Sequence, residues 1–161
     1  MPRYHVRRSD RELTDPAELD GILAEGKYVT IAMARENEPY LVTMSYGFDP
    51  ARRALYFHAA PEGLKYAFME ANPNVCATVV LDGGYVRGEC EHHYTSAVLR
   101  GTLSRVSDPA ELRYGMRVLL DHLESGSPEY AETPALERDE AYERMAVLRL
   151  DLDEVTGKRG K

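Results

Sequence analysis

A stretch of strict alternation over residues 40–48 constrains the fold of this chain more than any other feature. Its even-numbered side chains are bulky and apolar: Tyr40, Val42, Met44, Tyr46 and Phe48. Its odd-numbered side chains are Leu41, Thr43, Ser45 and Gly47. Successive side chains of a β-strand point to opposite faces. We therefore predict a strand with one face in a core. The other face, small and polar at Thr43 and Ser45, is either an ordinary exposed surface or a support for a flat ligand.

Five further β-rich runs follow the same logic, at residues 28–34, 54–58, 75–81, 94–106 and 145–152. Short turns join the first three strands, which predicts antiparallel pairing. Helices are expected after Asp15-Pro16, after Pro61-Glu62-Gly63 and after Asp108-Pro109, and a loop is expected at residues 125–134. The helical stretches are too short and scattered for a parallel α/β sheet. We expect a single domain over residues 1–161, mainly β: a six-stranded antiparallel barrel with peripheral helices.

The bulk properties narrow the range of partners. The 161 residues suit one ordinary domain, and the net charge of −7 argues against nucleic-acid binding, which needs a basic face. No apolar run is long enough to cross a membrane, and no apolar stretch follows the basic start of the chain as in a secretory signal. We therefore expect a cytoplasmic protein that binds neither membrane nor nucleic acid.

The segment from His58 to Lys65 is the second candidate for chemistry. It passes from the end of a predicted strand through small residues into the first turn of a helix. A cation there disfavours an isolated helix but suits a bound phosphate, although most lysines are simply solvated surface residues. His58 fits several roles: a hydrogen-bonded structural residue, a flavin contact, a proton donor, or a ligand to a metal or haem iron.

These residues resemble a known family. The run Tyr56-Phe57-His58-Ala59-Ala60-x-Glu62-Gly63-x-Lys65, followed by Asn72-Pro73-x-Val75-Cys76, is similar to the pyridoxamine-phosphate-oxidase-like flavoproteins, and most of all to their nitroimidazole-resistance (Nim) branch. Residues 8–13, Tyr94-x-Ser96 with Gly101, and residues 150–158 resemble that branch in the same order. The resemblance thus extends over nearly the whole chain.

The resemblance implies an FMN-binding split barrel that forms a homodimer, with flavin at the subunit interface and a small-molecule substrate. It places Thr43 and Ser45 on the strand that supports the flavin, Lys65 at the phosphate and His58 near the ring. Tyr94 and Ser96 would approach the cofactor, either from the same subunit or from the partner subunit. The oxidase proper ends in a tail containing arginine and proline, whereas residues 157–161 read Gly-Lys-Arg-Gly-Lys. Vitamin B6 oxidation is therefore not expected.

The reaction class expected from this resemblance is an FMN-dependent oxidoreductase. Electrons would pass from a nicotinamide or another donor to a small organic acceptor, with nitroaromatics as the candidate class and His58 as a catalytic proton donor. Three alternatives stay open. The barrel could bind or carry haem through His58, His92 or His93, it could hold flavin without turnover as a redox sensor or store, or its flavin could be the deazaflavin F420.

Cys90, His92 and His93 also invite a metal interpretation. Adjacent strand residues point to opposite faces, so His92 and His93 would not easily share one ion, whereas Cys90 and His92 could. Because the sequence offers no second ligand pair, we expect no metal site.

Overall fold

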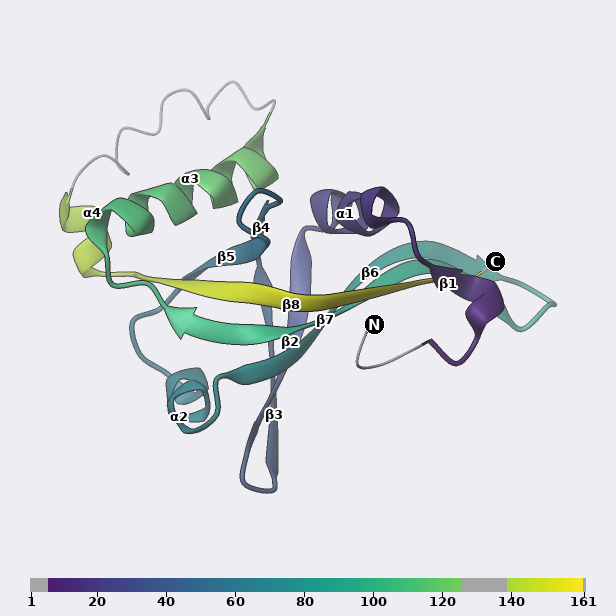
Figure 1. The fold of residues 1–161 in the computed structure, drawn as a ribbon, viewed down its shortest axis with the longest axis horizontal. Coiled ribbons are helices and arrows are strands. Elements are labelled where there is room, and N and C mark those ends of the chain that lie inside the picture. Colours follow the sequence, from purple (N-terminus) through teal and green to yellow (C-terminus); the bar gives the residue numbers. More distant parts are fainter. Residues whose placement is uncertain (1–5, 126–138, 161) are drawn as a thin grey trace.

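The computed structural model describes residues 6–125 and 139–160 and is built around one sheet (Figure 1). The order of the strands in this sheet is β3-β2-β6-β7-β8-β5-β4, with β1 added on β8, and every pairing is antiparallel. The strands are β1 (Glu12–Leu13), β2 (Tyr28–Arg35), β3 (Glu38–Ser45), β4 (Gly47–Asp49), β5 (Ala54–Ala59), β6 (Asn74–Val86), β7 (Glu91–Arg105) and β8 (Ala146–Gly160). The helices are α1 (Pro16–Glu25), α2 (Leu64–Ala71), α3 (Pro109–Glu124) and α4 (Asp139–Glu143), and a 3-10 turn covers Ser9–Arg11. The loop expected at residues 125–134 lies outside the described residues from 126 onward.

The expected mainly antiparallel fold with peripheral helices is confirmed, with eight strands in place of six. One extra strand is the two-residue β1. The other arises because the strand predicted over residues 40–48 divides at Tyr46. The Tyr46 amide donates to Lys27 O (3.4 Å) and its buried hydroxyl donates to Leu23 O (2.7 Å). These bonds hold the point at which the chain leaves β2 and begins to pair with β5.

Two strands are longer than predicted. β6 continues through Asp82-Gly83-Gly84, where a break was expected, because the irregularity there is a β-bulge. The Asp82 carboxylate accepts from the Gly84 amide (2.7 Å), and Gly84 takes a φ of 93° that glycine tolerates best. β8 continues from the predicted end near residue 152 to Gly160 and pairs with β7 along its length.

The core lies on the inner face of the curved sheet. There, α1 contributes the buried Ile22 and Leu23, and β2, β6, β7 and β8 contribute alternate apolar residues. β5 is buried on both faces: Leu55 and Phe57 belong to the main core, while Ala54 and Tyr56 pack beneath α3 in a second cluster. The close approach of α3 depends on Gly47, since a Cβ there would lie 2.5 Å from the Leu119 Cα.

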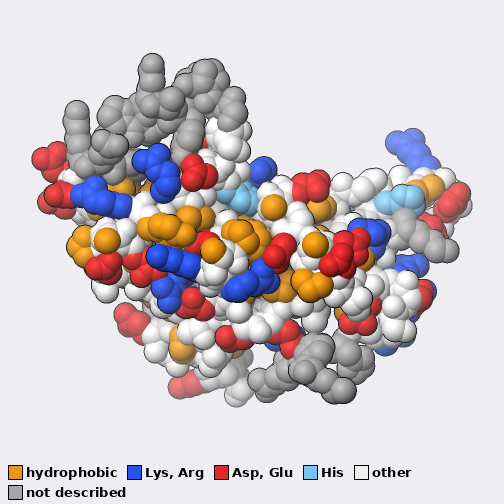
Figure 2. Space-filling model, turned by 45° about the horizontal axis from the view of Figure 1, so that its top comes forward, with side chains coloured by type: hydrophobic (Ala, Val, Ile, Leu, Met, Phe, Trp, Pro, Cys, Tyr) orange, Lys and Arg blue, Asp and Glu red, His pale blue; other side chains and the backbone are white. Residues whose placement is uncertain are grey.

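The described surface carries mixed charge. Figure 2 shows Lys and Arg side chains interspersed with Asp and Glu on the face it presents. In the described part of the chain, no helix has both the length and the apolar character needed to cross a membrane.

Candidate functional site

A hollow of about 540 Å³ lies where β3, the end of β5, the start of α2 and helix α3 meet. Four of the six predicted binding residues line it: Thr43, Ser45, His58 and Lys65. They come from three separate elements, so the fold and not the sequence spacing brings them together.

The polar wall of this hollow is the exposed face of β3. Thr43 and Ser45 are exposed, whereas Val42 and Met44 pack against the core, as the alternation predicts. The Thr43 hydroxyl hydrogen-bonds with the Thr30 hydroxyl on the neighbouring strand (3.0 Å). The face therefore offers two exposed hydroxyl groups, of which that of Thr43 is oriented by its neighbour on β2.

His58 lies at the rim of the hollow. It is exposed, whereas the rest of β5 is buried. Its imidazole has no hydrogen-bond partner among the residues that the structure describes. The ring is therefore available to a ligand.

The start of α2 differs from the starts of the two longer helices. Asp15 caps α1 by accepting from the Ala17 amide (3.0 Å), and Asp108 caps α3 by accepting from the Glu111 amide (2.9 Å). Each of these helices also has an acid in its first turn. α2 follows Gly63, which has no side chain to cap it, and Lys65 stands in a first turn that contains no acid. The amide groups of that turn and the lysine together favour an anion.

A second cation, Arg105, approaches the same aromatic ring as Lys65. The ring of Tyr66 has the Lys65 Nζ at 4.9 Å and the Arg105 Cζ at 5.4 Å from its centroid. Arg105 donates to Pro61 O (3.3 Å), and the Tyr66 hydroxyl donates to Ala60 O (2.5 Å), so both fix the loop before α2. Arg105 was not predicted, because nothing in the sequence relates the end of β7 to this loop.

The apolar wall is formed by α3, and sequence reasoning missed it. Met116, Leu119, Leu120 and Leu123 line the hollow opposite the polar residues of β3 and β5. Helical spacing of these residues indicates an apolar face, but it does not say which surface the face covers.

Tyr94 and Ser96 do not join this hollow. They lie on β7, which β2 and β6 separate from β3, although the strand register puts them on the same sheet face as Thr43. Three strand spacings amount to about 14 Å. A hydrogen bond from Lys158 lowers the pKa of Tyr94, with a further contribution from Arg11. These residues thus form a separate group near the free end of the β6–β7 hairpin.

Cys90 and His92 line a smaller hollow of about 290 Å³ with Arg11 and Tyr94. The His92 Nε2 pairs with the Asp82 carboxylate (2.7 Å). In the described ranges, no three His, Cys, Asp or Glu residues group as metal ligands would.

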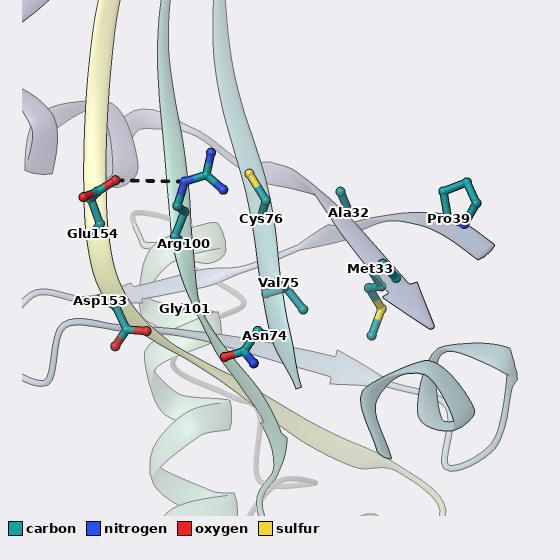
Figure 3. Close-up of a pocket in the computed structure, with 11 residues that line it drawn as sticks. Ala32, Met33, Pro39, Asn74, Val75, Cys76, Arg100, Gly101, Asp153 and Glu154 are labelled. Carbon is teal, nitrogen blue, oxygen red and sulfur yellow. Dashed lines mark ion pairs between the residues drawn. The ribbon is translucent and has the colours of Figure 1, made fainter. Parts of the chain in front are cut away.

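Another hollow, of about 810 Å³, lies on the outer sheet face (Figure 3). Residues of β2, β3, β6, β7 and β8 line it, and the Arg100 Nε lies 3.9 Å from the Glu154 Oε1 on the neighbouring strand. We place the candidate site in the hollow of about 540 Å³, because among the described residues an imidazole without a hydrogen-bond partner, an uncapped helix start and exposed hydroxyl groups converge there.

Comparison with known proteins gives this geometry a family. A family model described as pyridoxamine 5'-phosphate oxidase matches residues 15–159. The chain belongs to this family. Its membership confirms the relationship inferred from the His58–Cys76 motifs. No curated protein matches this oxidase-family chain at a significant level.

Solved structures agree with the family. A candidate 5-nitroimidazole antibiotic resistance protein from Bacteroides thetaiotaomicron is 26% identical, with a TM-score of 0.77, over 92% of this chain and 86% of that one. The flavocytochrome Anf3 from Azotobacter vinelandii (22% identical, TM-score 0.79) matches over 99% of this chain and 74% of that one. An FAD and haem binding protein from Mycobacterium smegmatis is 23% identical, with a TM-score of 0.74. The match covers 94% of this chain and 74% of that one. The last two likenesses establish the shared fold of this oxidase-family chain.

Proposed function

We propose that this chain is a homodimeric FMN-binding oxidoreductase that reduces a small organic acceptor, of which nitroaromatics are the first class to test. The convergence of Thr43, Ser45, His58 and Lys65 on one hollow carries the proposal. The hollow suits a flat amphipathic ring with a phosphate tail, because it has one polar wall, one apolar wall and an anion-favouring helix start. Family membership and the flavin named for two of the similar folds, FAD in one of them, support a flavin cofactor.

Each residue has a distinct part in the proposed site. Lys65 and the first amides of α2 bind the phosphate, while Thr43 and Ser45 orient the ring through hydrogen bonds. The leucines of α3 exclude water from the other side. A bound flavin supplies the electron transfer between a nicotinamide or other donor and the acceptor. The His58 imidazole, once protonated, donates a proton to the reduced acceptor.

The cofactor claim is tested by absorption spectroscopy of the purified protein and mass spectrometry of the released cofactor. FMN gives two broad bands in the near-ultraviolet and blue, whereas a sharp Soret band would indicate haem and contradict FMN. Lys65→Ala should weaken FMN binding roughly 10- to 100-fold, the worth of one charge-assisted hydrogen bond. Riboflavin, which lacks the phosphate, is the matched control and should bind both proteins alike. A colourless protein that takes up no added FMN would overturn the proposal.

The dimer is proposed because Tyr94 and Ser96 share a sheet face with Thr43 but lie three strands away, a lateral separation of about 14 Å. The same outer face exposes large apolar side chains, including Tyr28 (61%), Leu41 (64%) and Val80 (48%). A second copy packed on this face with twofold symmetry would cover them. It would also bring Tyr94 and Ser96 of the partner subunit toward Thr43 and Ser45.

Mixing two defective variants tests a shared site. Lys65→Ala and Ser96→Trp each impair every site in their own homodimers. In a mixed dimer, both changes fall on one site and leave the other intact. Random exchange should therefore restore about one quarter of the FMN sites. If Ser96→Trp alone binds FMN normally, or if two weakened variants recover no binding on mixing, the sites lie within single subunits.

A further inference from the structure

His122 lies outside the candidate hollow and yet joins the elements that form it. It belongs to the last turn of α3, next to Leu123, which lines the hollow. Its Nδ1 lies 3.3 Å from the Phe48 amide nitrogen on β4, and its Nε2 lies 2.6 Å from the Gly26 carbonyl oxygen after α1. One imidazole therefore bridges α3, β4 and the end of α1.

The two partners fix the protonation state of this ring. The Phe48 amide is a donor, so Nδ1 must accept and carry no hydrogen. The Gly26 carbonyl is an acceptor, so Nε2 must carry the hydrogen. A second proton, on Nδ1, would point at the Phe48 N–H and break that contact. The bridge exists only with the neutral Nε2–H tautomer.

The surroundings also disfavour a charged ring. The Tyr46 ring packs against the imidazole at 5.0 Å between centroids, with its own hydroxyl engaged by Leu23 O. Lys27 donates to the His122 carbonyl (3.0 Å) and places a cation nearby. Asp49 on β4 is held by Tyr114 and by backbone amides, while Asp121 and Glu124 neighbour His122 on α3 itself. Burial lowers the pKa of His122, and Lys27 lowers it further against the opposing Gly26 bond.

The bridge matters because it sets the two walls of the hollow. α3 supplies the leucine wall, and β4 continues directly from β3, which carries Thr43 and Ser45. We propose that His122 is a positioning residue whose neutral imidazole holds α3 at the spacing that the site requires, so that acidification opens the site. The link to ligand binding rests on the proposed function, whereas the opening of α3 does not.

The direction in which pH changes the folding stability follows from proton linkage. A lowered pKa means that the folded chain binds fewer protons at this ring than the unfolded chain. The stabilisation is complete above the ordinary histidine range near 6.5 and is lost as pH falls through the folded-state pKa. For the same reason, ligand affinity should fall at most about tenfold for each pH unit below that pKa.

A glutamine at position 122 separates the effect of the two hydrogen bonds from the effect of protonating the imidazole. In His122→Gln, the amide oxygen can accept from Phe48 and the amide nitrogen can donate to Gly26, but the side chain does not titrate. Nitrogen NMR of the flavin-free wild type should identify the Nε2–H tautomer. The Phe48 amide and the second half of α3 should lose hydrogen-exchange protection from pH 7.5 to 5, and His122→Gln should keep it. Equal loss of protection in both proteins, or an Nδ1–H tautomer, would overturn the proposal, whether or not flavin binds.

A second experiment measures FMN affinity. Wild type and variants are compared at the same pH, because the phosphate of FMN itself titrates near pH 6. Wild-type affinity should fall more steeply toward acid than that of His122→Gln. His58→Gln serves as the control for the second histidine at the site and should keep the steep decline. Parallel pH profiles for wild type and His122→Gln would contradict the role in binding.

Discussion

Lys65 occupies a position where an isolated helix would favour an acid. The other two long helices follow that rule with an aspartate cap and a first-turn glutamate, and α2 does not. The departure costs stability in the empty protein and is offset only when an anion binds. The phosphate-binding role proposed for Lys65 thus coincides with a departure from the usual helix-capping pattern.

Reversing the charge at this position should separate stability from binding. Lys65→Glu should raise the free energy of unfolding of the flavin-free protein by about 0.5 kcal/mol, because an acid suits the start of a helix. The same change should abolish FMN binding. Urea denaturation and fluorescence titration measure the two effects, and Lys65→Gln should fall between. A variant that binds FMN normally would show that Lys65 is a surface lysine.

Asp49 is the residue on which the β4–β5 turn depends. Its buried carboxylate accepts from the Ala51 and Arg52 amides (3.0 and 3.1 Å) and from the Tyr114 hydroxyl (2.5 Å). Asp49→Ala should lower the free energy of unfolding by about 3 kcal/mol, and Tyr114→Phe, which removes one of the bonds, by about 1 kcal/mol. Chemical denaturation checks both values. Equal losses would mean that the turn amides contribute nothing.

Among the elements, α3 decides the shape of the site. It packs on β4 and β5 and presents leucines to the hollow. The helix packs closely against Gly47 of β4. A Cβ at Gly47 would lie 2.5 Å from the Leu119 Cα and 2.6 Å from the Val118 carbonyl oxygen. The helix backbone itself is in the way, and no side-chain rotation can relieve the contact.

A methyl group at Gly47 should therefore displace α3. Gly47→Ala should destabilise the protein by about 2–3 kcal/mol and weaken FMN binding at the same time. Gly21→Ala is the matched control, because Gly21 is an exposed position inside α1 with open space around it. That change should stabilise the chain by about 0.5–1 kcal/mol. Comparable stability of the two variants would contradict the close packing of α3 against Gly47.

At the scale of the molecule, the outer sheet face is the surface proposed to meet a second copy. Leu41→Glu should give a largely monomeric protein with weak FMN binding and normal circular dichroism. Ala17→Glu, an exposed change on α1, should stay dimeric. Light scattering after size-exclusion chromatography measures the mass. A dimeric Leu41→Glu protein would place the subunit contact elsewhere.

The sequence predicted the fold wherever local pattern decides it. Alternation over residues 40–48 identified the exposed Thr43–Ser45 face, and Asp-Pro pairs marked two helix starts. It could not predict the division of that strand at Tyr46, because this depends on contacts with Leu23 and Lys27. At Asp82, a side-chain bond turned an expected strand end into a bulge. The positions of Arg105, His122 and α3 near the hollow are all products of long-range packing, which no local spacing reveals.

The central place of β8 has a consequence for biosynthesis. This strand pairs with β1, β5 and β7, so it joins the two parts of the sheet, and yet it follows every other described element along the chain. A nascent chain cannot join β5 to β7 until residues 146–151, which pair with β5, have left the ribosome. Until then, the edges of β5 and β7 stay unpaired and prone to association with other chains. Truncation within β8 should therefore yield aggregates in the cell instead of a smaller stable domain.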